Sequence, residues 1–305
     1  MAQMDSQWNK LAKEIMETGW DEKPEEVRAV YESDKAPAPT RYLLNKQFIF
    51  SGDEAPIMFG KKINPIKPFK EIEWIIIKKS NHLADLHKEG IHFWDNWDMG
   101  DGTIGKAYGY QNSLRVYPVP ADKVNRSLLD PHKGVLIENG HILMDQIDYL
   151  IHNLINNPRS RRHIIMLWNI QDISKMKLPP CVYRSEWFVD GDDKLHVKVG
   201  ARSSDLALGN PFNTIQYHAL HKMIAQVVGL ELGDMIFDMG NVHIYDRHFD
   251  GVQLILDRKR EDAPATRLIL PPNVRNLYDF NMEDLRLENY TEDLYSPFVR
   301  FEIAE

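Results

Sequence analysis

The sequence contains one cysteine in 305 residues. A single cysteine excludes an intrachain disulfide, so we expect a protein of the reducing cytoplasm, or of the host cytoplasm if the chain is viral. The sequence also lacks an apolar run as long as a membrane span, and it lacks any segment that resembles a signal peptide. We therefore expect no membrane partner.

An excess of basic residues is also missing. Lys and Arg number 37 against 45 Asp and Glu, which gives a formal net charge of −8. General nucleic-acid binding depends on neutralising many phosphates with Lys and Arg, so this balance argues against a nucleic-acid partner. An anionic ligand must instead be met by a local group of basic side chains.

No Pro-, Gly- or Ser-rich linker divides the chain, and no internal repeat is found. Hydrophobic residues make up 43% and charged residues 27% of the sequence, which is ordinary for a globular protein with a sizeable core. The length exceeds that of an average domain, but a mixed domain of this size can be single. We expect one catalytic domain over residues 1–305, of the α/β (α+β) class.

Apolar periodicity predicts the main elements. Helices are expected as two short amphipathic pieces within residues 1–33, and then over 66–86, 144–156 and 217–228. Strands are expected at 42–50, 164–168, 186–189, 195–199, 233–237 and 263–270. Residues 202–213 are too polar for a core strand, so we expect them to form a loop that contacts a ligand.

Cys181 directly follows Pro179 and Pro180. Two prolines restrict the backbone before the thiol, so Cys181 is a candidate nucleophile. Packing as a small hydrophobe is the alternative role of a lone cysteine. The hairpin and the polar stretch that follow favour the nucleophile.

Two further groups of charged residues are candidates. Glu71 and Glu73 lie in the apolar segment 66–86, where a carboxylate is costly unless it has a partner or a catalytic role. Arg161 and Arg162 precede the expected strand 164–168. They form either a solvated edge or a phosphate site, because each planar guanidinium can donate two charge-assisted hydrogen bonds to a dianion.

In chain order, the motifs resemble those of the folate-dependent thymidylate synthase superfamily. The matching residues run from about Glu71 to about His248 and are Trp94, Trp97, Gly105, Tyr108-Gly109, Asp145-Gln146, Pro158, Ser160-Arg161-Arg162, Pro180-Cys181, Arg202-Ser203, Asp205, Leu208-Gly209, Pro211-Phe212-Asn213, His243-Ile244-Tyr245 and His248. The resemblance implies a large mixed sheet with flanking helices, and a homodimer through the sheet face with shared active sites. It also implies one-carbon transfer from 5,10-methylenetetrahydrofolate to a pyrimidine deoxynucleotide, dUMP or dCMP.

The resemblance assigns roles to individual residues. It implies that Cys181 attacks the pyrimidine, and that the other catalytic residues are Glu71, Tyr108, Asn213 and Asp205. It implies substrate binding by Arg161, Arg162, Arg202, Ser203, Asn213, His243 and Tyr245, with Arg41 standing in for an arginine of a loop that differs here. It implies contacts to the reduced folate from Trp94, Trp97, Asp205, Leu208, Gly209 and Phe212, and no metal.

Two of these residues carry further expectations. Asn213 favours dUMP, because a carboxamide can accept from N3–H of uracil and donate to O4, whereas deoxycytidylate hydroxymethylases have an aspartate there. The guanidinium of Arg202 is expected to favour the thiolate form of Cys181 and so to lower the thiol pKa.

The sequence departs from the family pattern at three single residues and one segment: Val182, Glu186, Asn241 and the charged end 301–305. In the family an apolar tail closes over the folate, so a charged tail should admit water to the reactive methylene. We therefore expect 5-hydroxymethyl-dUMP as the product, made by a deoxyuridylate hydroxymethylase. The alternatives are a thymidylate synthase, a deoxycytidylate hydroxymethylase, or a catalytically inactive nucleotide-binding homologue.

Overall fold

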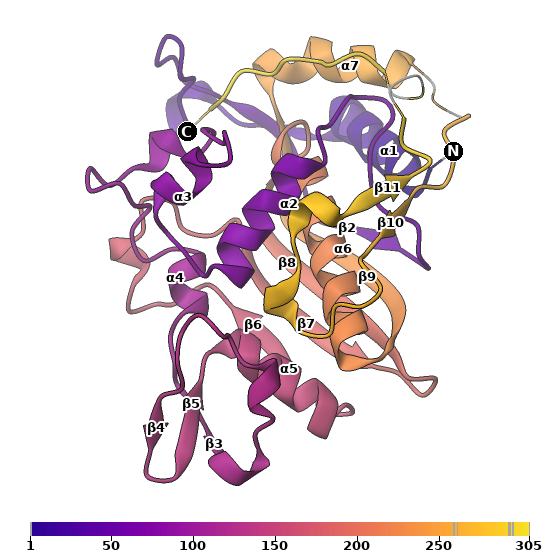
Figure 1. Cartoon of the computed structure of the whole chain (residues 1–305). Coiled ribbons are helices and arrows are strands. Elements are labelled where there is room, and N and C mark those ends of the chain that lie inside the picture. The colour runs from indigo at the N-terminus through magenta and orange to yellow at the C-terminus, as the bar shows by residue number, and fades with distance from the viewer. Residues whose placement is uncertain (1, 259, 261, 292–293, 295, 305) are drawn as a thin grey trace.

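The computed structural model describes residues 2–258, 260, 262–291, 294 and 296–304. At its centre is a six-stranded sheet with the order β1-β2-β9-β8-β7-β6 (Figure 1). Its strands are β1 (Trp20–Asp21), β2 (Thr40–Phe50), β6 (Ile164–Met166), β7 (Val182–Val189), β8 (Lys194–Asp205) and β9 (Glu231–Tyr245). β8 and β9 are parallel and the other neighbours are antiparallel, which confirms the expected mixed sheet.

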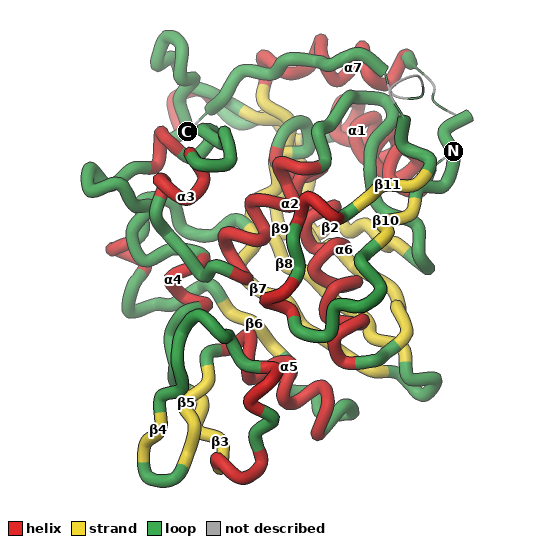
Figure 2. The backbone as a smooth tube through the Cα atoms, in the orientation of Figure 1, coloured by secondary structure: helices red, strands yellow, loops and turns green. Residues whose placement is uncertain are grey.

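Helices flank this sheet (Figure 2). They are α1 (Gln3–Thr18), α2 (Ile66–Ile72), α3 (Leu83–His87), α4 (Gly109–Asn112), α5 (Gln146–Asn156), α6 (Gly209–Val228) and α7 (Phe249–Asp257). α6 connects β8 to β9 and packs against both, since parallel strands need a crossover. It ends at Gly229, whose φ of 72° is the left-handed conformation that glycine adopts without strain. Within the described residues, no helix is long and apolar enough to cross a membrane.

The two faces of the sheet differ. Trp187, Val197 and Phe237 are fully buried in the core, whereas alternate side chains such as Met166 and Phe188 are exposed. Successive side chains of a strand point to opposite faces, so the exposed set belongs to the face away from the core. That face carries a hollow of ≈ 630 Å³, whose lining includes Met166, Trp168, Tyr183, Arg202 and Asp238.

Two smaller sheets complete the described structure. β3 (Tyr117–Pro120), β5 (His141–Met144) and β4 (Ile137–Glu138) form a sheet with its own small core, below the main sheet in Figure 1. β10 (Arg267–Ile269) pairs with β11 (Arg286–Glu288). The last expected strand is therefore present but shorter than predicted.

The expected second helix within residues 1–33 is wrong. α1 is one helix of 16 residues, and after a single 3-10 turn at Pro24–Glu26 the chain is extended. Val30 forms a β-bridge with Pro37, and Tyr31 forms one with Ala304 near the C-terminus. Pairing with these distant segments overrides the helical spacing of the apolar residues.

Three other expectations also need correction. The segment 66–86 is not one helix, because a π-helical turn at Glu73–Ile77 is followed by Lys79 in the left-handed region with φ 48°. The strand expected at 164–168 ends earlier, at Met166, and lies at the edge of the sheet with Ile164 and Met166 exposed. The expected loop 202–213 is mostly regular structure, because β8 continues to Asp205 alongside β9, and α6 begins at Gly209.

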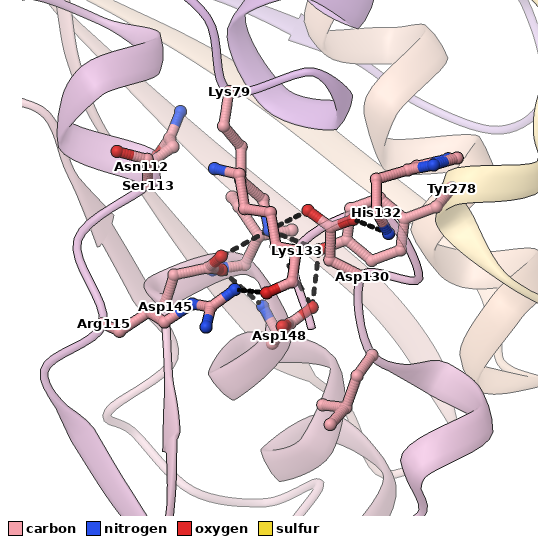
Figure 3. Close-up of polar contacts among 12 residues, drawn as sticks. Lys79, Asn112, Ser113, Arg115, Asp130, His132, Lys133, Asp145, Asp148 and Tyr278 are labelled. Atoms are coloured by element: carbon pink, nitrogen blue, oxygen red, sulfur yellow. Dashed lines mark hydrogen bonds and ion pairs between the residues drawn. The ribbon is translucent and has the colours of Figure 1, made fainter. Parts of the chain in front are cut away.

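The break at Lys79 coincides with a buried ionic cluster (Figure 3). Nζ of Lys79 lies 3.3 Å from Asp130, forms a closer ion pair with Asp145, and donates to the Tyr278 hydroxyl over 2.7 Å. Tyr278 in turn donates to Asp148 over 2.5 Å. These residues come from four separate segments of the chain, so one ammonium joins the helix α5, the β3–β5 sheet and the C-terminal region.

Removing this ammonium should strongly destabilise the fold. Lys79→Met leaves buried carboxylates without a counter-charge, and we expect it to lower the free energy of unfolding by about 3–5 kcal/mol. Lys78→Met is the matched control, because Lys78 pairs with Glu73 and Glu89 at a partly exposed position and should cost under about 1 kcal/mol. Equal losses in the two variants, measured by urea unfolding, would contradict a structural role for the cluster.

Candidate active site

Cys181 lies immediately before β7 and is held from two sides. Its backbone N–H donates to the hydroxyl of Tyr108 over 3.0 Å, and its carbonyl accepts from the backbone N–H of Arg202 over 2.9 Å. The Arg202 guanidinium donates to the carbonyls of Pro179 (2.8 Å) and Pro180 (3.0 Å). The residues around the thiol are therefore fixed by hydrogen bonds as well as by the prolines.

The electrostatics of the thiol differ from the expectation. Burial raises the pKa of Cys181, while the charge of Arg202 and the hydrogen bond with Tyr108 lower it. Arg202 thus acts in the expected direction, but desolvation outweighs it. Arg202 therefore favours the thiolate as expected, but burial makes the net pKa of the thiol in the free protein higher than its usual value.

Tyr108 occupies an unusual backbone conformation. Its φ is 44° and its ψ −103°, outside the regions that ordinary residues favour. The next residue must be glycine, because a Cβ on Gly109 would lie 2.0 Å from the carbonyl oxygen of Ser80. Burial raises the pKa of Tyr108 well above its usual value, so its hydroxyl remains protonated. It can accept from Cys181 and still donate a proton elsewhere.

Glu71 is buried at the end of α2 in a hydrogen-bonded chain. Its carboxylate accepts from the Trp94 indole over 2.6 Å and from the side chain of Gln216. Burial raises the pKa of Glu71 to about 7, and the two hydrogen bonds oppose this shift. The neighbouring Glu73 is instead paired with Lys78 over 3.3 Å, as expected for a structural residue.

The same chain of hydrogen bonds continues to Asn213. Nδ2 of Asn213 donates to Oε1 of Gln216 over 3.0 Å, and both residues lie in the first two turns of α6. Sequence reasoning missed Gln216, because it lies between the expected loop 202–213 and the expected helix 217–228, and only the earlier start of α6 at Gly209 places it one turn after Asn213. The structure therefore connects two predicted catalytic residues, Glu71 and Asn213, through one that was not predicted.

The aromatic residues surround this network. Trp94 is buried against Trp97 (ring centroids 5.3 Å apart) and Tyr108 (5.2 Å). Trp97 and Phe212 are partly buried, and Phe212 packs edge-on against Phe93. The indole N–H of Trp94 is already used by Glu71, so Trp94 orients the carboxylate and Trp97 is the more accessible ring.

Asp205 ends β8 opposite His243 of β9. Its carboxylate accepts from the backbone N–H groups of Ala207 (2.9 Å) and Leu208 (3.2 Å), which shapes the turn into α6 at Gly209. Burial lowers the pKa of His243, so its ring is neutral near pH 7. Tyr245 packs edge-on against His243 at 5.3 Å, and Ser203 lies beside Asn241 of β9.

A buried lysine near Asp205 was not predicted. Nζ of Lys61 donates to the carbonyl of Ala207 over 2.6 Å. Burial lowers the pKa of Lys61 to about 8, against the opposing charge of Asp205. No pattern in the sequence distinguishes Lys61 from the neighbouring Lys62.

The predicted arginines are placed differently from one another. Arg41 is bound to Asp21 over 2.6 Å and to the carbonyl of Met16 over 2.8 Å, so a phosphate role would require these bonds to break. Arg161 and Arg162 are exposed in the loop before β6. The structure thus leaves these two guanidinium groups accessible, whereas that of Arg41 is already engaged.

The C-terminal tail packs against the body of the protein. Phe301 is buried against His248, and its ring lies 4.8 Å from Nζ of Lys61. The carboxylate of Glu302 pairs with Arg247 over 3.0 Å, and its backbone carbonyl bonds to the His248 ring. Arg247 also pairs with Asp34 over 2.8 Å, so one guanidinium holds both carboxylates. Glu305 lies outside the described residues.

A family model described as thymidylate synthase matches residues 6–304. This chain belongs to the thymidylate synthase family. The thymidylate synthases of Bacillus mojavensis and Bacillus subtilis subsp. natto are 43% and 44% identical to it, over 100% of each chain. The solved structure of thermostable thymidylate synthase A from Bacillus subtilis matches with a TM-score of 0.85 and 41% identity, covering 99% of both chains. The family resemblance and the expected fold are confirmed.

The expected hydroxymethylase activity is wrong. The full-length relatives are named thymidylate synthases, which favours the alternative of dTMP formation. The expectation rested on a charged tail that closes poorly. In the structure, however, Phe301 is buried and the charge of Glu302 is paired with Arg247. The sequence shows that residue 302 is a glutamate, but it does not show the ion pair with Arg247.

Glu71 should control the pH dependence of turnover. If its ionised form accepts protons, kcat/KM should fall as pH drops below about 7, and Glu71→Gln should remove this limb and slow turnover about 10²–10⁴-fold. Glu73→Gln is the matched control and should retain the limb. A limb near pH 7 that persists in Glu71→Gln would contradict the assignment.

Glu71→Gln should also change how the free energy of unfolding depends on pH. The folded-state pKa of Glu71 is raised above the unfolded value, so its contribution to stability is full below about pH 4.5 and is lost as pH rises through 7. Glu71→Gln cannot ionise, so its unfolding free energy should lack this decline between pH 4.5 and 8.

Proposed function

We propose that this chain is a thymidylate synthase, which converts dUMP and 5,10-methylenetetrahydrofolate into dTMP and dihydrofolate. The enzymes of this family are one-carbon transferases that act on dUMP with this folate as co-substrate. The observation that carries the proposal is a fixed thiol, Cys181, beside the protonated Tyr108. A reducing cytoplasm suits this free thiol.

In the proposed mechanism Cys181 adds to C6 of the pyrimidine, which makes C5 nucleophilic. The folate supplies the carbon and then the hydride. Because the thiol pKa is raised in the free protein, the thiolate must be stabilised on substrate binding, and Arg202 is the residue whose positive charge lowers this pKa. Glu71, with a pKa of about 7, and Tyr108 are suited to move the C5 proton.

Substrate recognition is proposed for the residues around Cys181. Two of the five N–H groups of Arg202 bind the prolyl carbonyls, which leaves others for the phosphate, and Ser203 lies next to it on β8. Asn213 is held by Gln216 and is proposed to bind the uracil edge. The sugar is proposed to contact His243 and Tyr245. The folate is proposed to contact Asp205, Trp97, Leu208, Gly209 and Phe212.

We further propose that the open face of the sheet forms the homodimer interface. It carries exposed apolar side chains and the hollow lined by Trp168 and Tyr183. Arg161 and Arg162 are accessible at the edge strand of that sheet, where they could bind the phosphate of a partner's substrate. The alternative is that both arginines only form a solvated edge. In that case, mutation of either arginine would leave substrate binding unchanged.

Product analysis tests the proposed function. We expect one dihydrofolate for each dTMP, measured by absorbance and by mass spectrometry of the nucleotide. Cys181→Ser is the control, because an alcohol is nearly isosteric but far less nucleophilic, and it should retain less than about a hundredth of the rate. Formation of 5-hydroxymethyl-dUMP with tetrahydrofolate would refute the proposal.

Base selectivity tests the role of Asn213. Asn213→Asp should shift the ratio of kcat/KM for dUMP and dCMP toward dCMP, because a carboxyl matches the cytosine edge better than it matches N3–H and O4 of uracil. Asn213→Ala is the matched control, and it should weaken dUMP turnover without a gain for dCMP. Unchanged selectivity in Asn213→Asp would mean that another group binds this edge.

A further inference from the structure

Two histidines and one aspartate form a compact group on the surface after α3. Nε2 of His87 lies 2.7 Å from one carboxylate oxygen of Asp95, and Nδ1 of His92 lies 3.2 Å from the other. The three possible ligand atoms all lie within 4.8 Å of one another. None of these residues takes part in the chemistry proposed above.

The backbone fixes His87 in this group. α3 ends in a Schellman motif, in which Gly90 donates to the carbonyl of His87 (3.0 Å) and Ile91 donates to that of Leu86 (3.0 Å). Gly90 has the left-handed φ of 66° that this motif requires. Leu86 and Ile91 are buried at about 1% exposure, so the turn is anchored in the core.

His92 and Asp95 are fixed by the next turn. The backbone N–H of Asp95 donates to the carbonyl of His92 over 3.1 Å, which places the two side chains three residues apart on one side. Trp94 lies between them in the sequence and is buried. The rings of His87 and His92 are stacked with centroids 4.7 Å apart, so both present a nitrogen to the same carboxylate.

The donor set selects a class of cation. Two imidazole nitrogens and one carboxylate oxygen suit Zn²⁺ and similar divalent transition metals, whereas Mg²⁺ and Ca²⁺ prefer sites made of oxygen alone. We propose that His87, His92 and Asp95 bind one Zn²⁺ ion, with water completing the coordination. Three protein ligands and an open position form a common zinc arrangement.

The geometry requires only small movements. Tetrahedral ligands at zinc are about 3.4 Å apart, given metal–ligand distances of about 2.0–2.2 Å. The two His–Asp separations, 2.7 and 3.2 Å, are somewhat shorter than that value, and all three ligand atoms lie within 4.8 Å of one another. The three side chains are between 41% and 64% exposed. Rotation of exposed rings can therefore close the site without moving the anchored backbone.

Metal binding would also stabilise the segment that carries Trp94 and Trp97. A ligand that binds the folded state and not the unfolded chain raises the melting temperature. The three ligands span residues 87–95, so the ion would connect the end of α3 to the turn that begins at Asp95.

Calorimetric titration with Zn²⁺ tests the proposal. Untagged protein carrying Cys181→Ser is used, because the thiol could otherwise bind zinc. We expect one site that prefers Zn²⁺ to Mg²⁺, at least tenfold weaker binding when His92→Gln is added, and a zinc-dependent rise in melting temperature that this variant loses. His82→Gln is the matched control, an exposed histidine outside the group, and should bind as the parent does.

A second readout separates coordination from a general effect of charge. Co²⁺ should give the visible absorption of a four-coordinate nitrogen–oxygen site in the parent and in His82→Gln, but not in His92→Gln. Failure of the parent to bind Zn²⁺ would overturn the proposal. Equal Zn²⁺ affinity in His92→Gln and the parent would overturn it as well, and circular dichroism checks that each variant is folded.

Discussion

The hydrogen bond between the Cys181 amide and the Tyr108 hydroxyl joins the two parts of the site. One partner precedes β7 of the central sheet, and the other precedes α4 in the segment that follows the broken 66–86 helix. The positive φ of Tyr108 is maintained because Gly109 packs directly on the backbone of Ser80. The position of Tyr108, and so of its hydrogen bond with Cys181, therefore depends on the path of the chain at Ser80.

That path depends in turn on the buried ionic cluster. Lys79 adopts a left-handed conformation, and its side chain reaches Asp130, Asp145 and Tyr278. A positive φ is unfavourable for lysine, so the ion pairs of the cluster must offset its cost. The strained conformation at Tyr108 is thus linked to the ion pairs of Lys79, the residue directly before Ser80, in a region with no direct part in catalysis.

The elements that could be predicted are those whose signal is local. The hairpin of β7 and β8 has alternating strands and an Asp-Gly turn, and α6 ends at a glycine, so both were found from the sequence. The break at Lys79 could not be found, because the ionic cluster that stabilises it joins residues up to 199 positions apart. Polarity was also misleading at Ser204 and Asn210, which bond to each other and are buried where β8 leads into α6.

The candidate site shows the same division. Family motifs identified Cys181, Tyr108 and Glu71, but the role of Gln216 becomes visible only when α6 lies beside α2. Charge was hardest to interpret, because its effect depends on partners that are distant in sequence. Glu302 is paired with Arg247, whereas Glu71 has no cation among its hydrogen-bond partners Trp94 and Gln216. Burial raises the pKa of Glu71 to about 7 against these two hydrogen bonds. One carboxylate is therefore suited to fix the tail and the other to exchange protons near pH 7, although nothing in their residue type distinguishes them.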